Sequence, residues 1–238
     1  INRLRRAGKI VAHAVEATGR GLTVGRTESD IAGELAHRLV RHGATPERLQ
    51  VWGDGRGRRF RQWTHSENKV YRSCTIGAVA RVQGLYVGAA RTITFGDPTN
   101  EILEAFEKAA LVTATGMFFS QSGWELFEVW QRVKRIYEKC GAGEEWRLAE
   151  QADVVEFEYG AIPLMPTSEF RLFPGVPIYW HPSVDEVGMG ETVLATERGA
   201  EWLTPCTDWP KVPITVKGTP VEVPGILIVP KTNGNKPH

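Results

Sequence analysis

The chain has 238 residues, of which 42% are hydrophobic and 24% are charged. This length allows one large core or two closely joined halves, and the charged fraction is that of a folded globular protein. Lysine plus arginine (29) and aspartate plus glutamate (28) nearly cancel. The chain therefore has no overall field that would hold nucleic acid or an anionic membrane, and we expect neither as a partner.

The cysteines and the apolar stretches limit where the protein works. Three cysteines, Cys74, Cys140 and Cys206, are odd in number and lack CxxC spacing, which is typical of a reduced cytoplasmic protein. The longest apolar stretch covers residues 109–119 and is interrupted by Gly116, whereas a membrane span needs about 20 apolar residues. We expect a cytoplasmic location and no membrane span.

Two helices are predicted at the start of the chain. In residues 3–18 the apolar side chains recur at steps of three and four, which indicates an amphipathic helix that Gly19 would end. Thr27 and Asp30 have the spacing of a capping box, so we expect a second helix to follow them and to close at Gly43.

The next segments predict a loop, two strands and a third helix. Residues 53–59 are rich in glycine and arginine; they form either a solvated loop or an anion site, since no helix with phosphate-binding spacing follows. Residues 74–95 are predicted to form two strands around a turn at Gln83 and Gly84. A third helix is expected to start after residues 97–99 and to run to about Phe119.

The rest of the chain repeats this order of helix and strands. A fourth helix is predicted over residues 124–139. Short strands are then expected at residues 154–159, 176–180, 191–196, 201–204, 214–216 and 226–229. Helices followed by strands, twice, predict an α+β chain with quasi-repeated halves of about residues 1–120 and 121–230 and one sheet with helices on its outer face. The polar tail, residues 231–238, is expected to be frayed.

Several segments, taken in order, resemble the creatinase/aminopeptidase P-like family, M24, whose fold is called pita-bread. Residues 84–96 resemble its motif G-Y-x-x-D-x-x-R-T-x-x-x-G, and residues 173–182 resemble P-G-M-x-x-x-x-E-P. Residues 191–204 resemble its closing E-D-T motif. The resemblance implies a single pita-bread domain over residues 1–230, with a curved and mainly antiparallel sheet. It also implies a homodimer, and we expect the family's N-terminal domain to be absent from this chain.

The same resemblance implies that the family's metal site is lost. Peptidases of the family hold two metal ions with two Asp, one His and two Glu, because hard divalent ions need such a cluster of carboxylates. The matching positions here hold Gly77, Gly88, His181 and Gly190, and residues 148–152 contain no histidine. We therefore expect neither a metal nor any other cofactor.

Two histidines remain as candidate catalysts. His65 matches the histidine with which creatinase hydrolyses a C–N bond without metal, and an imidazole near neutral pKa can take and return a proton. His65 is therefore either an acid/base catalyst or a structural residue. His181 is a candidate second acid/base. Ala90 replaces a companion glutamate of creatinase, which would weaken such a catalyst.

Other residues are candidates for substrate binding. Arg91 is either a buried ion-pair partner or a clamp for a carboxylate. Glu150 is placed near the former metal cleft. Tyr86 and Trp180, together with Trp63 and Tyr179, either line a small-molecule site or fill the space that the metals left.

Two functions therefore remain open. The first is a metal-independent, creatinase-like hydrolase that acts on or binds a small polar metabolite in the former metal cleft. The second is a catalytically inactive pseudo-peptidase that serves as a binding or scaffold module. An active metallopeptidase is not expected.

Overall fold

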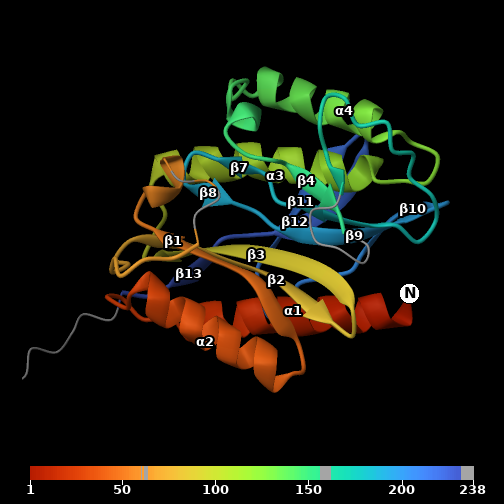
Figure 1. The fold of residues 1–238 in the computed structure, drawn as a ribbon. Helices are drawn as coiled ribbons and strands as arrows, with labels where there is room; N and C mark the ends of the chain where they lie inside the picture. Colours follow the sequence, from red (N-terminus) through yellow and green to blue (C-terminus); the bar gives the residue numbers. More distant parts are fainter. Residues whose placement is uncertain (60, 62–63, 156–161, 232–238) are drawn as a thin grey trace, which may run out of the picture.

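The computed structural model describes residues 1–59, 61, 64–155 and 162–231. Its first half begins with two helices, α1 (Asn2–Arg20) and α2 (Glu28–Arg41). They pack on a four-stranded sheet of order β1-β2-β3-β13. The first three of its strands are β1 (Thr45–Gly53), β2 (Ser73–Val82) and β3 (Leu85–Phe95), and Figure 1 shows both helices below them.

Local sequence explains where these elements begin and turn. The predicted capping box is present: Thr27 accepts a hydrogen bond from Asp30 N, and the Asp30 side chain accepts one from Thr27 N. The predicted turn between β2 and β3 is also present, with Gln83 at φ 52° and Gly84 at φ 84°. Positive φ at both central residues is the geometry of the two-residue hairpin turn that matches strand twist.

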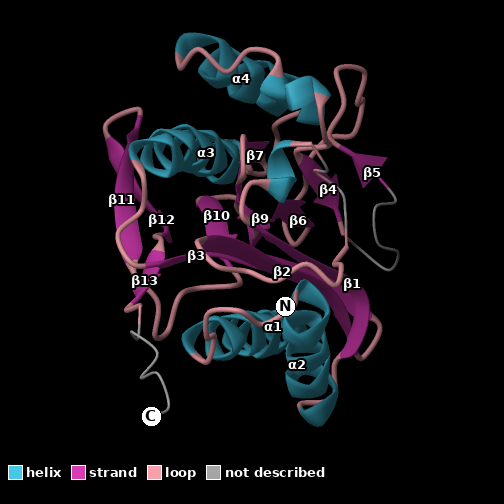
Figure 2. Cartoon of the chain, turned by 90° about the vertical axis from the view of Figure 1, so that its left-hand side faces the viewer, coloured by secondary structure: helices cyan, strands magenta, loops and turns pink. Residues whose placement is uncertain are grey.

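The second half lies on the other side of the strands. Two helices lie on that side, α3 (Asn100–Phe119) and α4 (Leu126–Lys139), and Figure 1 and Figure 2 place them above the sheet. A five-stranded sheet has the order β10-β9-β6-β4-β5. Its strands are β4 (Ala152–Val154), β5 (Ile162–Pro163), β6 (Pro177–Trp180), β9 (Glu191–Thr196) and β10 (Gly199–Trp202).

Short elements complete the fold. Two-residue strands β7 (Ser183–Val184) and β8 (Val187–Gly188) pair with each other. The hairpin of β11 (Lys211–Val216) and β12 (Thr219–Pro224) packs on α3, and β13 (Leu227–Val229) runs parallel to β3. Single turns of 3₁₀ helix occupy Arg56–Arg58 (η1) and Glu145–Arg147 (η2).

The predicted elements agree with the structure in most places. All four helices are found, and the strand over residues 191–196 coincides with β9. The strand expected at residues 201–204 lies two residues earlier, at Gly199–Trp202. Of the strand expected at residues 154–159, residues 156–159 lie outside the described part of the chain. Strands β1, β5, β7, β8 and β12 were not predicted.

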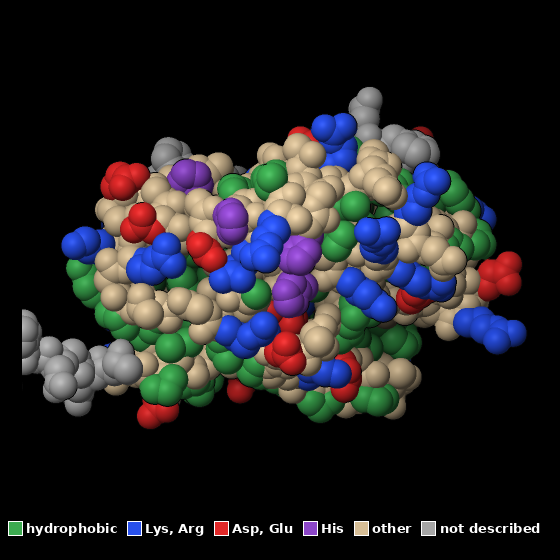
Figure 3. Space-filling view, turned by 90° about the horizontal axis from the view of Figure 1, so that it is seen from below, with side chains coloured by type: hydrophobic (Ala, Val, Ile, Leu, Met, Phe, Trp, Pro, Cys, Tyr) green, Lys and Arg blue, Asp and Glu red, His purple; other side chains and the backbone are tan. Residues whose placement is uncertain are grey.

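Two hydrophobic cores lie on the two sides of the junction. One gathers side chains of α1, α2 and β1–β3, and the other gathers side chains of α3, α4 and the five-stranded sheet. Although α3 belongs to the first half by sequence, its side chains pack in the second core. Within the described residues, no helix is long and apolar enough to cross a bilayer. The outer face of α1 and α2 carries many Lys, Arg and His side chains (Figure 3).

The halves meet where β3 approaches β9. Ala90 N donates to Gly190 O at 2.9 Å, and the two residues form an isolated bridge. Thr192 Oγ1 donates to Gly88 O at 2.7 Å and accepts from Gly88 N at 2.9 Å. These contacts join the middle of β3 to the start of β9.

Trp180 anchors the second core. Its side chain is fully buried, and its indole Nε1 donates to Ser120 Oγ at 2.9 Å. Its ring lies against Gly116 of α3, where an added Cβ would come within 2.5 Å of Trp180 Cε3. A glycine inside a helix costs stability relative to alanine, and here it is explained by this close approach.

We predict that Gly116→Ala destabilises the protein by about 1–3 kcal/mol, because overpacking against Trp180 outweighs the gain in helix propensity of about 1 kcal/mol. Gly33→Ala in α2 is the matched control, since an added Cβ there meets no atom within 4 Å; it should stabilise by about 0.5–1 kcal/mol. Denaturant unfolding of both variants measures the two free energies. The same sign for both would contradict this packing.

Candidate functional site

Three of the expected ligand positions are glycines that lie at the junction of the two halves. In the register of β2 and β3, Gly77 stands opposite Ala90, and Ala90 bridges to Gly190. Gly88 lies on the same strand as Ala90, two residues before it. An added Cβ at Gly77 would lie 3.1 Å from Ala90 Cβ. The backbones of β2, β3 and the start of β9 are thus closely packed at this point.

The ring of Tyr179 occupies the space beside two of these glycines. An added Cβ at Gly88 would lie 2.5 Å from Tyr179 Cε2, and one at Gly190 would lie 2.9 Å from Tyr179 Oη and 2.5 Å from Ala90 N. Real Cβ atoms do not come so close to a ring or to backbone. Tyr179 is fully buried, and burial raises the pKa of its hydroxyl to about 12.

A histidine and a carboxylate pair next to this ring. His181 Nε2 lies 2.8 Å from Asp153 Oδ2, and both side chains are buried. The imidazole lies beside the Tyr179 ring with 4.9 Å between ring centroids. A carboxylate hydrogen-bonded to imidazole fixes the orientation of the ring, so His181 is held in one position.

The cavity that remains in the cleft is very small. Its volume is about 10 Å³, which is roughly the room that one water molecule needs. It is lined by Gln50, Trp52, Arg61, Ala90, Ala149, Tyr179, His181, Ser183, Gly188 and Met189. As far as the described residues line it, the cleft between the halves is therefore packed rather than open.

Two side chains at the cleft, Arg61 of the cavity wall and Asp153 behind His181, each keep buried atoms without a hydrogen-bond partner among the described residues. Arg61 Nη2 pairs with Glu145 Oε2 at 2.6 Å, but its Nε and Nη1 have no hydrogen-bond partner in the structure. Asp153 Oδ1 is also buried without a partner. Buried polar atoms are normally hydrogen-bonded, so a water molecule in this cavity could bond to the free nitrogens of Arg61, which lines it.

Arg91 lies in a buried charge network that joins the halves. Its guanidinium forms ion pairs with Glu191 and with Glu16, the latter at 3.3 Å, and donates to Thr204 O at 3.1 Å. All three charged side chains are buried. Thr204 Oγ1 and Trp202 Nε1 also donate to Glu191. Arg91 therefore acts as an internal ion-pair partner in this structure, one of the two roles that the sequence left open.

The other predicted site residues lie in separate places. His65 is half-buried at the start of α2, where its Nδ1 lies 3.3 Å from Ser29 Oγ. Glu150 is exposed.

Tyr86 is partly buried against a small cluster that contains Tyr179, whereas Trp180 faces the core on the opposite side of β6. Trp63 lies outside the described residues. The structure thus brings Tyr86 close to the Tyr179 and His181 pair.

Sequence reasoning missed Asp153 and Arg61. Asp153 had a weak signal, because it is a lone acid in the apolar run of residues 152–155. Arg61 had none, since it is one of several arginines in a loop. Two other arginines of the loop are paired: Arg56 lies 2.5 Å from Glu28 and Arg58 lies 2.9 Å from Glu186.

Donor groups for a metal do not converge in the described parts of the chain. Among these residues there is no group of three or more His, Cys, Asp or Glu side chains that could hold a metal ion. The His181 and Asp153 pair supplies two such groups, and Glu191 is engaged by Arg91, Thr204 and Trp202.

Comparison with known proteins by sequence and by structure points to the same group of peptidases. A sequence model of metallopeptidase family M24 matches residues 2–196. The fold is similar to that of an X-Pro aminopeptidase from Thermotoga maritima MSB8, with a TM-score of 0.80 and 17% identity over 96% of this chain and 62% of that one. A prolidase from Pyrococcus furiosus matches with a TM-score of 0.80 and 21% identity, over 87% of this chain and 64% of that one.

A third solved structure, the dipeptidase PepE from Mycobacterium ulcerans, matches with a TM-score of 0.81 and 16% identity, over 96% of this chain and 60% of that one. The chain thus spans about three fifths of the length of each of these proteins. No curated protein sequence matches this chain. At such low identities the structural likeness concerns the fold.

We predict that Arg91→Met costs about 3–5 kcal/mol, because it leaves two carboxylates buried without their cation. Burial already raises the pKa of Glu191 to about 7 against the opposing effect of Arg91, and removing Arg91 raises it further. A carboxyl with a raised folded pKa contributes stability below its unfolded pKa and loses it as the pH rises. The loss in free energy of unfolding caused by Arg91→Met should therefore grow from about pH 5 to about pH 8.

Denaturant unfolding at both pH values measures this deficit, and the double variant Arg91→Met/Glu191→Gln is the control. Removing the second charge should recover part of the loss at the higher pH. A deficit that is the same at both pH values, or a double variant no better than the single one, would contradict the network.

Proposed function

The chain belongs to metallopeptidase family M24, and from this premise we propose that it is a catalytically inactive member that serves as a binding or scaffold module. The observation that carries the proposal is the position of Tyr179. Its ring lies where side chains at Gly88 and Gly190 would have to stand. Those are two of the positions that the family resemblance assigns to metal ligands.

The residues of the cleft do not fit a dinuclear metal centre. A pair of hard cations needs several carboxylates around a shared space. Two of the expected positions, Gly88 and Gly190, are glycines covered by the Tyr179 ring. A third, His181, is hydrogen-bonded to Asp153. The one glutamate of β9 in this region, Glu191, is held by Arg91, Trp202 and Thr204.

The geometry supports metal-independent catalysis by His65 less well than it supports an inactive binding or scaffold module. A general base must be within hydrogen-bond reach of the proton that it abstracts. His65 lies beside Ser29 at the start of α2, while His181 lies in the cleft after β6. The cleft cavity of about 10 Å³ is far below the roughly 300 Å³ of small-molecule sites. Within the part of the chain that the structure describes, a metabolite would have no room in this cavity unless Tyr179 moved.

We predict that Mn²⁺ or Co²⁺ leaves the melting temperature unchanged. An ion at a hundredfold excess over Kd would add about 2.7 kcal/mol, or about 5–10 °C for a chain of this size. The experiment is a thermal melt with each metal and with a chelator, in a His13→Ala/His42→Ala background. Those two rings lie 5.8 Å apart on the outer face of α1 and α2, so the background removes a pair of imidazoles that could hold an ion there.

The control variant is His181→Ala in the same background. A metal-dependent rise that is present in the parent and lost in this variant would place an ion in the cleft and overturn the proposal. Equal melting temperatures with metal and with chelator would support it.

A further inference from the structure

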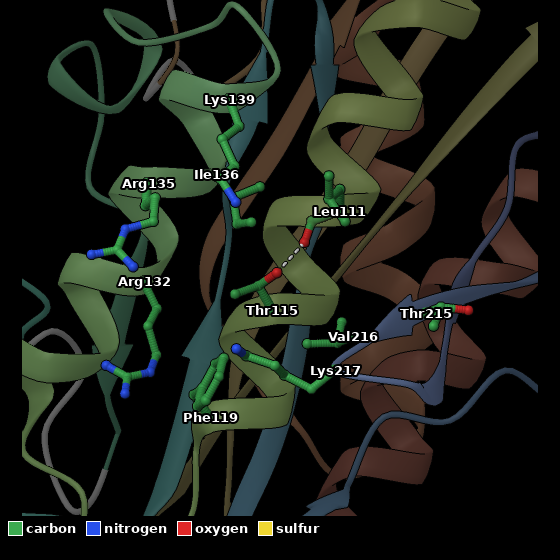
Figure 4. A pocket seen from close by; sticks show the side chains of 10 residues that line it. All are labelled: Leu111, Thr115, Phe119, Arg132, Arg135, Ile136, Lys139, Thr215, Val216 and Lys217. Atoms are coloured by element: carbon green, nitrogen blue, oxygen red, sulfur yellow. Dashed lines mark hydrogen bonds between the residues drawn. The ribbon is translucent and has the colours of Figure 1, made fainter.

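A groove on the outside of the second half has the properties of a ligand site. It lies between α3, α4 and the β11–β12 hairpin, and its volume is about 390 Å³. Small-molecule sites commonly have about 300–1,000 Å³. The groove is lined by Leu111, Thr115, Phe119, Arg132, Arg135, Ile136, Lys139, Thr215, Val216 and Lys217 (Figure 4). None of these residues lines the small cavity of the cleft.

The floor of the groove is apolar. Leu111 and Phe119 come from α3, Ile136 comes from α4, and Val216 comes from the hairpin. The hydroxyl of Thr115 donates to Leu111 O at 2.7 Å within the helix, so its proton is already used. An occupant would therefore contact mainly carbon atoms at the floor, which favours an apolar body.

The rim of the groove is cationic. Arg132, Arg135 and Lys139 follow one another on one face of α4, and Lys217 reaches across from the hairpin turn (Figure 4). No carboxylate is among the lining residues. The nearby Glu138 is already paired with Lys134 on the same helix. In a chain whose charges nearly cancel, four cations around one groove favour a negatively charged occupant.

One of these cations is held in place without a ligand. The Arg132 guanidinium carbon lies 4.1 Å from the centroid of the Trp124 ring and 4.8 Å from that of Phe119. Stacking on two aromatic rings orders the side chain before anything binds. An ordered guanidinium loses less entropy when it pairs with a carboxylate.

We propose that this groove binds a small amphipathic carboxylate, with its apolar body on the floor and its carboxylate among the four cations. The proposal goes beyond the function proposed above and is independent of it, because it depends on no residue of the cleft. A carboxylate suits the planar fork of arginine, and the apolar floor suits a hydrocarbon chain or an aromatic ring.

The test is calorimetric titration of the protein with decanoate below its micelle concentration, with decanol and acetate as partial ligands. Decanoate should bind at least about tenfold more tightly than either, since it alone has both the apolar body and the charge. Decanol binding as tightly as decanoate would show that the cations have no role and would overturn the proposal. So would decyl phosphate binding while decanoate does not.

The variant Arg135→Gln/Lys139→Gln should weaken decanoate binding about tenfold or more. Both side chains are exposed, so the fold should persist, and a thermal melt checks it. The matched control is Arg3→Gln/Lys9→Gln, which removes two exposed cations from α1 on the opposite side of the sheet. Equal weakening in both variants would indicate a general charge effect and contradict the site.

A second variant, Leu111→Glu, tests the floor. It places a carboxylate in the groove at a half-exposed helix position and should abolish decanoate binding by charge repulsion and loss of apolar contact. Decanoate binding with unchanged Kd in a folded Leu111→Glu protein would also overturn the proposal.

Discussion

The arrangement of this molecule depends on the close contact between β3 and β9. Ala90 N donates to Gly190 O at 2.9 Å, and Thr192 bonds both backbone groups of Gly88. At this separation a side chain on Gly88 or Gly190 would collide with Tyr179 or with the backbone of Ala90. Glycine at these positions and tyrosine at 179 are therefore one packing solution: the absence of two side chains makes room for one ring.

The same contact explains the buried charges. When two halves with separate cores are joined along a line, groups near that line are removed from water, and a buried charge is tolerated only when it is paired and hydrogen-bonded. Arg91 of β3 meets Glu191 of β9 and Glu16 of α1 there. Its ion pairs thus connect elements of both halves. The cavity left in the cleft has room for about one water molecule. The larger groove, with its four cationic side chains, lies outside the cleft, between α3, α4 and the β11–β12 hairpin.

Much of the fold could be predicted from sequence because its signals are local. Helical periodicity and the Thr27 capping box fix the helices, and Gln83 and Gly84 fix the hairpin of β2 and β3. Strand β1 escaped prediction because it begins with polar residues and Pro46 at a sheet edge.

The residues of the cleft were harder to predict than the fold. Tyr179 and Trp180 are neighbouring aromatic residues, and alternation along β6 sends one to the cleft and the other to the core. Which residue faces which side depends on partners far away in the chain.

An aromatic ring, that of Tyr179, fills the junction between β3 and β9 in place of ligand side chains. The most direct measurement is a crystal structure of the protein grown with Mn²⁺, with anomalous data collected for manganese. We predict electron density for the Tyr179 ring against Gly88 and no anomalous peak in the cleft. A manganese peak between these strands, with the tyrosine ring turned away, would contradict the account.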